Sequence, residues 1–289
     1  MTPTSRGVPP TVIFLHVTKT AGTTLAHVAQ QQYPAQRFLR TDHDFDAFQR
    51  RLAVMPDAEK HTIDCLFGHM AFGLHQLLPR PAVYATMLRE PVDRVMSHYY
   101  YAIHATDHPL HRRVVDERMT PEDYLRSGVL EELNDGQVRR LSAARDEQIP
   151  YGSVPRELLE TAKQNLRAHF VVGLTESFDA SLLLFSRALG WTKLNYVTLN
   201  VTPGRPARSS LPADLRRLIE QYNALDAELY QYAKALFTEQ LGRHGVTPAA
   251  VLGFRLRRRY ERWRRRMARM RSRRPRISPT LLRFWSRMC

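Results

Sequence analysis

The stretch that decides the expected fold is Thr11-Val-Ile-Phe-Leu-His-Val-Thr-Lys-Thr-Ala-Gly-Thr-Thr24. Residues 11–17 are mostly β-branched or apolar, which predicts a short buried strand. Residues 23–32 then predict a helix. A strand that passes through a glycine-containing turn directly into a helix is the start of a βα unit.

Strands alternate with helices along the rest of the chain. Further strands are predicted at residues 62–67, 82–88 and 170–174, and helices at 92–104, 120–133, 155–168, 178–189 and 213–241. Residues 200–212 form a predicted loop rich in Pro, Gly and Arg. This order predicts an α/β fold with a central parallel sheet that helices cover on both faces.

Composition narrows the class of protein. The chain has 289 residues, of which 43% are hydrophobic and 25% charged, as is ordinary for a globular protein. Its two cysteines exclude a disulfide scaffold and a four-thiolate zinc site. The net charge is +15, but residues 254–289 hold 15 Arg against one acid, Glu261. The remaining residues are therefore nearly neutral.

The turn after the first strand has the features of an anion site. Ligands of parallel sheets bind outside the carboxyl ends of the strands. Gly22 would let the backbone approach a ligand, the helix start offers unpaired amides, and Lys19, Thr23 and Thr24 add further donors. The order differs from a Walker A motif, because Lys19 precedes Gly22. The alternative is an ordinary turn with a surface lysine.

A second group of polar residues follows the strand at 82–88. Arg89 lies at the strand end, and Arg94 and Ser97 are three residues apart on one side of the next helix. Arginine and serine side chains that converge there suit a phosphate. The alternative is that Arg94 pairs with Asp93 or Glu90 on the surface.

Together the two segments resemble the nucleotide motifs of sulfotransferases that use 3′-phosphoadenosine 5′-phosphosulfate (PAPS). The matching segments are Thr18-Lys-Thr-Ala-Gly-Thr-Thr24 and Arg89-Glu-Pro-Val-Asp-Arg-Val-Met-Ser-His-Tyr-Tyr100, with Thr18 where that family usually has Pro. The chain is most similar to carbohydrate sulfotransferases related to heparan sulfate 2-O-sulfotransferase, in a compact bacterial-type form. The resemblance covers about residues 12–237 and is weak at residues 199–202 and 226–230. It implies a P-loop-like three-layer fold, here with a basic C-terminal helical tail.

The resemblance also implies roles for single residues. Lys19 would contact the oxygen that bridges phosphate and sulfate, and Arg89 and Ser97 would hold the 3′-phosphate. The implied nucleotide-binding set is Lys19, Thr20, Ala21, Gly22, Thr23, Thr24, Arg89 and Ser97. No metal is expected, because Lys19 and the loop amides would take over its charge, and no His, Cys and carboxylate cluster has metal-ligand spacing.

A general base is expected at the end of the second predicted strand. Gly68-His69 lies there, and an imidazole with an ordinary pKa of about 6.5 suits proton transfer near neutral pH. The resembling family has its proposed base at this position. His75 and His16 are the competing candidates; His16 alternatively is a buried strand histidine.

Contacts to the acceptor are less closely defined. The resemblance makes Asn134, Gln137 and Arg140 possible substrate contacts, with a plain helix end as the equal alternative. The run Tyr99-Tyr100-Tyr101 packs either the adenine or sugar, or the core. Arg205 and Arg208 lie in a loop of the kind that covers a 3′-phosphate. The acceptor is expected to be a carbohydrate or a glycolipid.

The basic C-terminal segment has an amphipathic pattern. Leu256, Tyr260, Trp263, Met267 and Met270 recur at helical spacing between arginines, Pro275 ends the pattern, and residues 281–285 add a second apolar cluster. Such a segment fits an anionic membrane surface, here through residues 254–285. The alternatives are a disordered polyanion-binding tail and a coiled-coil partner.

These patterns predict three parts: a flexible N-terminus at residues 1–10, a sulfotransferase domain at 11–245 and an Arg-rich tail at 246–289. Without a signal-peptide pattern or membrane span, we expect a cytoplasmic protein, peripheral on the inner face of the membrane. The competing functions are a nucleotide kinase, a nucleic-acid- or polyanion-binding protein and a non-enzymatic scaffold. The nearly neutral body disfavours nucleic acid.

Overall fold

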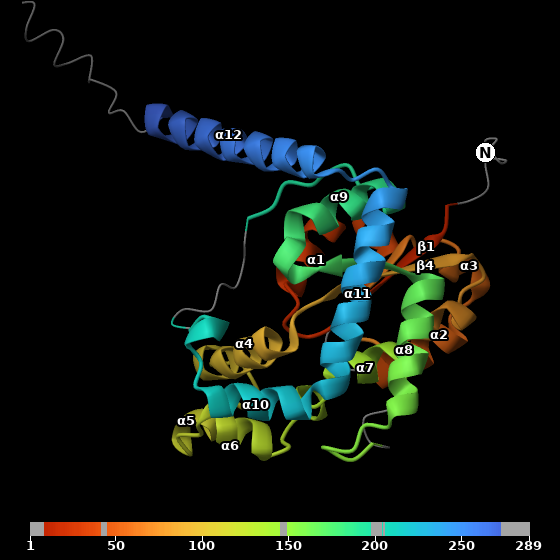
Figure 1. The fold of residues 1–289 in the computed structure, drawn as a ribbon. Helices are drawn as coiled ribbons and strands as arrows, with labels where there is room; N and C mark the ends of the chain where they lie inside the picture. Colours follow the sequence, from red (N-terminus) through yellow and green to blue (C-terminus); the bar gives the residue numbers. More distant parts are fainter. Residues whose placement is uncertain (1–8, 42–44, 145–148, 198–203, 205, 273–289) are drawn as a thin grey trace, which may run out of the picture. The chain divides into compact units, whose positions relative to one another are not determined.

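The computed structural model describes residues 9–41, 45–144, 149–197, 204 and 206–272 (Figure 1). The chain divides into two compact units, residues 1–246 and 247–289. In the second unit the described part is one helix, α12 (Pro248–Ser272). The predictions for the N-terminal residues 1–8, for Arg205 and for the apolar cluster at 281–285 lie outside the described residues.

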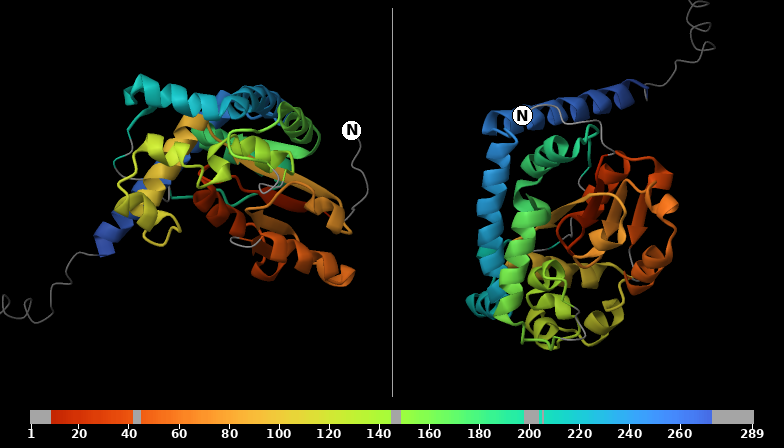
Figure 2. Two further views of the ribbon diagram at one scale, coloured as in Figure 1. Left: turned by 90° about the horizontal axis from the view of Figure 1, so that it is seen from below. Right: turned by 90° about the vertical axis from the view of Figure 1, so that its right-hand side faces the viewer.

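The first unit is built on a five-stranded sheet, as Figures 1 and 2 show. All neighbouring strands are parallel, in the order β2-β3-β1-β4-β5. The strands are β1 (Thr11–Leu15), β2 (Phe38–Thr41), β3 (Cys65–Gly68), β4 (Ala82–Leu88) and β5 (Phe170–Leu174). The predicted α/β fold with a parallel sheet flanked by helices is confirmed. The sequence did not predict β2, a short strand at the edge of the sheet.

The central strand β1 is buried along its whole length. On one face Phe14 stacks on Phe67 of β3 at 4.8 Å between ring centroids, and Phe185 of α9 contacts Phe14 edge-on at 5.8 Å. On the other face Tyr84 of β4 contacts Phe72 and Phe170. Both faces of the sheet therefore bury aromatic side chains, as a parallel sheet between two helical layers requires.

Helices enclose this sheet and extend beyond its carboxyl edge (Figure 2). Helices α4, α5, α6 and α10 share a separate apolar core that includes Val95, Met96, Tyr124 and Ile219. The helices of the first unit are α1 (Gly22–Gln30), α2 (Phe45–Val54), α3 (Asp57–Lys60), α4 (Pro91–His104), α5 (His111–Asp116), α6 (Pro121–Arg126), α7 (Gly136–Leu141), α8 (Arg156–His169), α9 (Phe178–Leu189), α10 (Ala213–Tyr222) and α11 (Ala224–Arg243).

Two predicted long helices are interrupted. The helix predicted at 120–133 ends at Arg126, because Gly128 adopts a φ of 60°, which leaves the helical region. The helix predicted at 213–241 breaks at Asn223, whose Nδ2 donates to the carbonyls of Ile219 and Leu133. A side chain that bonds local backbone carbonyls competes with helix formation at that position.

The free edge of β5 is closed by one side chain of α11. The N–H of Val172 donates to Gln240 Oε1 at 2.9 Å, and Gln240 Nε2 donates to the Phe170 carbonyl at 2.8 Å. Gln240 thus satisfies backbone groups that an edge strand otherwise exposes.

Candidate active site

The sheet topology places two predicted site residues side by side. From β1 the chain crosses toward β2, whereas from the adjacent β4 it crosses toward β5, so the loops after β1 and β4 diverge. Ligands of α/β sheets bind at such a point, outside the carboxyl ends of the strands. Lys19 follows β1 and Arg89 follows β4, and Arg89 Nη1 donates to the Lys19 carbonyl at 2.9 Å.

The loop between β1 and α1 has an unusual backbone. Lys19 and Ala21 have φ angles of 67° and 66°, in the left-handed region that non-glycine residues rarely adopt. The Thr20 hydroxyl is buried and donates to the Val17 carbonyl at 2.7 Å. This geometry starts α1 at Gly22 and turns its first amides toward the carboxyl edge of the sheet.

Gly22 also has a packing role that the sequence did not predict. A Cβ atom at this position would lie 1.7 Å from His16 Nε2. The missing side chain therefore makes room for the His16 ring; the close approach of a ligand to the Gly22 backbone stays a prediction. Any larger residue at position 22 would have to displace the imidazole.

The Lys19 ammonium faces the carboxyl edge of the sheet. Its Nζ lies 3.5 Å from the centroid of the Tyr101 ring, a cation–π contact with α4. Burial, followed by the positive charge of Arg89, lowers the pKa of Lys19 to about 8, against partial compensation by Glu132. Of the tyrosine run, Tyr101 thus faces the site, whereas Tyr99 is buried in the helical core and donates to the Met119 carbonyl.

His69 lies beside the same loop. It follows Gly68, whose φ of 151° and contact with the Thr41 carbonyl exclude a side chain, since a Cβ would lie 1.8 Å from that oxygen. His69 Nδ1 is 3.5 Å from Thr18 Oγ1. The structure therefore brings the predicted base and the predicted anion loop together.

The two other histidine candidates are placed differently. The His16 ring lies 4.4 Å from that of His69 between centroids, with the two rings tilted by 33°. Its buried Nε2 has no hydrogen-bond partner among the described residues, and burial holds the pKa of His16 well below its usual value. His75 bonds the hydroxyl of Tyr84, four residues before the end of β4, and contacts His169. His75 therefore lies away from the carboxyl edge of the sheet.

Arg94 does not face a phosphate site. Its side chain is fully buried, donates to the Glu132 carbonyl at 2.7 Å and forms an ion pair with Asp226 at 3.3 Å. Both predictions for Arg94, a phosphate contact and a surface pair with Asp93 or Glu90, are thus wrong. The three-residue spacing places Arg94 and Ser97 on the same side of α4, but it does not reveal that this side faces the protein interior. Ser97 itself is also buried.

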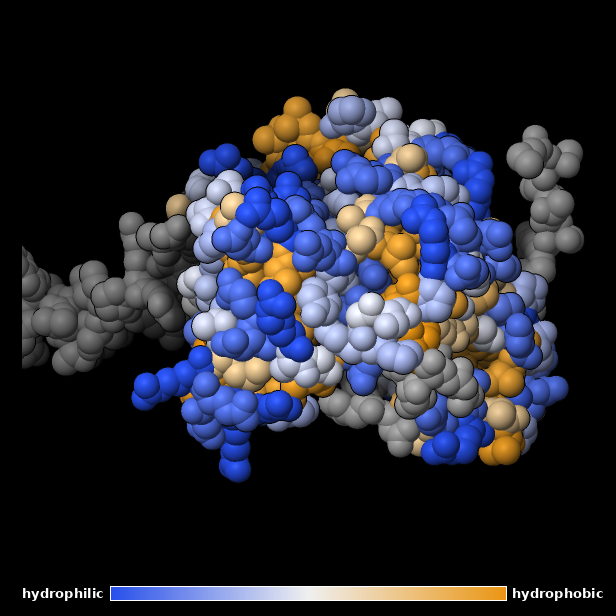
Figure 3. All heavy atoms as spheres, turned by 60° about the horizontal axis from the view of Figure 1, so that its bottom comes forward, coloured by the Kyte–Doolittle hydropathy of each residue, from blue (hydrophilic) through white to orange (hydrophobic). Residues whose placement is uncertain are grey.

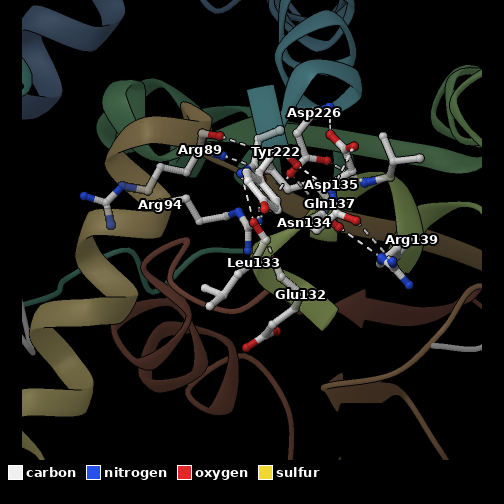
Figure 4. A network of polar contacts seen from close by, with 12 residues as sticks. Arg89, Arg94, Glu132, Leu133, Asn134, Asp135, Gln137, Arg139, Tyr222 and Asp226 are labelled. Atoms are coloured by element: carbon white, nitrogen blue, oxygen red, sulfur yellow. Dashed lines mark hydrogen bonds and ion pairs between the residues drawn. The ribbon is translucent and has the colours of Figure 1, made fainter. Parts of the chain in front are cut away.

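The segment around Gln137 belongs to a network of polar contacts that includes the backbone of Arg89, as Figure 4 shows. Gln137 is fully buried; its Nε2 donates to the Arg89 carbonyl at 3.0 Å and its Oε1 accepts the Arg89 N–H at 3.0 Å. Asp226 in turn accepts the N–H groups of Gln137 and Val138. Gln137 therefore fixes the backbone of Arg89, and the prediction that it contacts substrate is wrong.

Asn134 is likewise structural. It is buried, donates to the Tyr222 carbonyl and accepts the Gly152 N–H. Asp135 beside it, with a φ of 48°, accepts the Asp226 N–H, and burial followed by the neighbouring Asp226 carboxylate raises the pKa of Asp135. Arg140 remains a predicted substrate contact.

A scan against protein families matches residues 1–275 to the model described as Galactose-3-O-sulfotransferase. The chain belongs to this family. Among its relatives are the galactose-3-O-sulfotransferases 3 of Homo sapiens, 28% identical over 267 residues, and of Bos taurus, 28% identical over 254. These alignments cover 84% and 81% of this chain. The chain spans about three fifths of the length of these relatives.

Other relatives modify a different glycan position. Heparan-sulfate 6-O-sulfotransferase 1 of Homo sapiens is 32% identical over 186 residues, which cover 56% of this chain and 45% of the relative. The expected membership in the carbohydrate sulfotransferases is therefore confirmed. The relatives named here are 3-O and 6-O enzymes, whereas the motifs had suggested a likeness to 2-O-sulfotransferase.

Several contacts of this sulfotransferase-family site were not foreseen from the sequence. Buried His98 bonds Glu132 at 3.0 Å. Burial alone would raise the pKa of Glu132, but this hydrogen bond and the nearby positive charges of Arg140 and Arg94 hold it far below its usual range. Glu176, after β5, accepts the Glu90 N–H, and Arg208 pairs with Glu90 at 2.9 Å. Local sequence does not predict these contacts of Glu90 and Glu132, because their partners come from distant segments.

Metal-ligand groups and membrane-spanning helices are both absent from the described residues. Within them, no group of three or more His, Cys, Asp or Glu side chains is arranged to hold a metal ion. Among the helices that the structure describes, none combines the length and apolar character needed to cross a membrane.

Proposed function

We propose that the protein is a sulfotransferase that moves the sulfuryl group of PAPS to a hydroxyl of a carbohydrate acceptor. Family membership supports the reaction class. The observation that carries the proposal for this chain is the arrangement at the carboxyl edge of the sheet. Arg89, after β4, donates a hydrogen bond to the Lys19 carbonyl, after β1, at the point where the two loops diverge. His69 lies beside the Lys19 loop.

The residues at this edge suit a donor with two separate anionic groups. The first-turn amides of α1 after Ala21, with Thr23 and Thr24, suit the 5′-phosphosulfate. Arg89 suits the 3′-phosphate, and Ser97 is assigned there by resemblance. The bound donor supplies an activated sulfuryl group. Lys19 would stabilise the charge that develops on the leaving oxygen, because a nearby ammonium stabilises such charge most in a site with little water.

His69 would accept the proton of the attacking hydroxyl. Its place at the end of β3, beside the Thr18 hydroxyl, leaves it at the same edge as Lys19. The neighbouring His16 ring is neutral at pH 7 because burial lowers its pKa, so it adds no positive charge against proton uptake by His69. In-line displacement then depends on positioning and charge stabilisation.

The acceptor is proposed at the level of a class. The relatives are named for galactose and heparan sulfate, which are carbohydrates. A sugar hydroxyl on a free glycan or a glycolipid is therefore the proposed substrate. We also keep a cytoplasmic location at the inner face of a membrane as a proposal.

The donor assignment is tested by thermal unfolding with adenosine 3′,5′-bisphosphate (PAP), ADP or AMP. Because PAP alone carries a 3′-phosphate, it should raise the melting temperature most. A ligand at 100 times its dissociation constant adds about 2.7 kcal/mol of stability. Replacing Arg89 by Met should remove the difference between PAP and ADP. Equal stabilisation by ADP of the unaltered protein, or activity that needs Mg²⁺ and ATP, would favour the kinase alternative.

A further inference from the structure

Helix α12 carries a stripe of exposed apolar side chains. Leu252, Leu256, Tyr260 and Trp263 are each between 54% and 60% exposed, and the rings of the last two are 5.9 Å apart. Their gaps of four, four and three residues place them within about 80° of one side of a helix that advances 100° per residue. Met267 continues the stripe at the next four-residue step.

Arginines border this stripe on both sides. At 100° per residue, Arg257 and Arg264 fall along one edge, whereas Arg255, Arg259 and Arg262 fall along the other. The single acid of the segment, Glu261, falls on the side away from the stripe. The helix therefore presents large apolar groups inside a border of positive charge.

This charge pattern disfavours pairing with a second copy of the chain. The spacing of Leu256, Tyr260, Trp263 and Met267 is that of a coiled-coil seam. The positions that flank such a seam are Arg257, Arg259 and Arg264, so two copies would bring arginines together across the interface. A free polyanion would pair the arginines but leave the stripe in water.

We propose that α12 docks on an anionic lipid surface. The apolar stripe would enter the boundary between headgroups and acyl chains, and the bordering arginines would reach the lipid phosphates. Trp and Tyr suit this boundary because each has an apolar ring with one polar group. By comparison, Figure 3 shows a face on which apolar residues form small patches among hydrophilic ones. Docking would place the first unit near membrane-bound glycolipids; it does not depend on the sulfotransferase assignment.

The test is sedimentation of the full chain with vesicles. We expect it to bind vesicles that contain phosphatidylglycerol and to stay free of pure phosphatidylcholine vesicles at physiological salt. Trp263→Ser or Leu256→Ser should lower the partition coefficient at least about tenfold. The matched control is Val54→Ser, which removes an 84%-exposed apolar side chain of α2 and should change nothing.

Charge is tested in the same assay. Arg257→Gln should weaken binding about fivefold, whereas Arg112→Gln, at an exposed site on α5, should not. Failure of the full chain to bind phosphatidylglycerol vesicles would overturn the proposal. So would unchanged binding of the Trp263 and Leu256 variants, which would indicate plain polyanion binding, or a dimer in analytical ultracentrifugation that Trp263→Ser dissolves.

Discussion

Replacing Gln137 by Leu tests how the structure holds Arg89 in place. The change keeps the approximate length of the side chain but removes both hydrogen bonds to the Arg89 backbone. An unsatisfied buried backbone group costs about 1–3 kcal/mol, and both groups here are partly buried. We therefore expect the free energy of unfolding to fall by about 2–4 kcal/mol, measured by urea denaturation.

The effect on ligand binding distinguishes positioning from stability alone. Gln240 makes the same two-bond contact with the backbone of β5, so Gln240→Leu is a matched control with a similar loss of stability. We expect PAP to bind at least tenfold more weakly, about 1.4 kcal/mol, to the Gln137 variant only, as measured by calorimetry. Unchanged PAP affinity in Gln137→Leu, or an equal loss in Gln240→Leu, would show that Gln137 does not position Arg89 for the ligand.

Three further changes probe other parts of the site. His69→Ala should lower turnover by about 10²–10⁴-fold with PAP affinity retained, whereas the turnover of His75→Ala should stay near that of the unaltered protein. The opposite result would assign the general base to His75. Because the pKa of Lys19 is about 8, PAP affinity should fall as pH rises above 8, by up to about tenfold per pH unit. Lys19→Arg should show no such fall in calorimetry between pH 7 and 9.5. A PAP affinity that does not change with pH in the unaltered protein would contradict this. The pKa of Asp135 is raised to about 7 in the folded chain. Between its ordinary carboxyl pKa of about 4 and pH 7, the folded chain keeps a proton on Asp135 that the unfolded chain releases. The free energy of unfolding should therefore fall as pH rises from about 4 to about 7. Asp135→Asn keeps the acceptor for the Asp226 N–H. In urea denaturation this variant should be more stable than the unaltered protein by about 2 kcal/mol at pH 8 but not at pH 4. Equal stability of the two proteins at pH 8 would count against the effect of the Asp226 carboxylate on Asp135.

Much of the fold follows from local pattern. The strands at 82–88 and 170–174 have the predicted bounds, because each is a compact apolar run between polar ends. Edge strand β2 was not predicted because its four residues, which include the exposed Arg40, do not form an apolar run. The break at Asn223 depends on a contact with Leu133, 90 residues away, which no local pattern reveals.

The site residues also divide into those whose place follows from local pattern and those whose place depends on tertiary packing. Lys19, His69 and Arg89 each follow a strand, so parallel topology alone brings them to one edge. Arg94 and Gln137 also had the right chemistry for a ligand, but their direction is set by Asp226 and the Arg89 backbone. Residue type indicates what a side chain can bind, whereas tertiary packing decides which partner it meets.

The central claim is tested most directly by transfer of labelled sulfate from PAPS. The purified full chain would be incubated with labelled PAPS and, in parallel, with host glycan and glycolipid fractions, and the label in each fraction counted. We predict label on a carbohydrate hydroxyl, lost with Lys19→Ala and reduced about 10²-fold or more with His69→Ala. Absence of transfer to every fraction by protein that binds PAP, or equal transfer by Lys19→Ala, would contradict it.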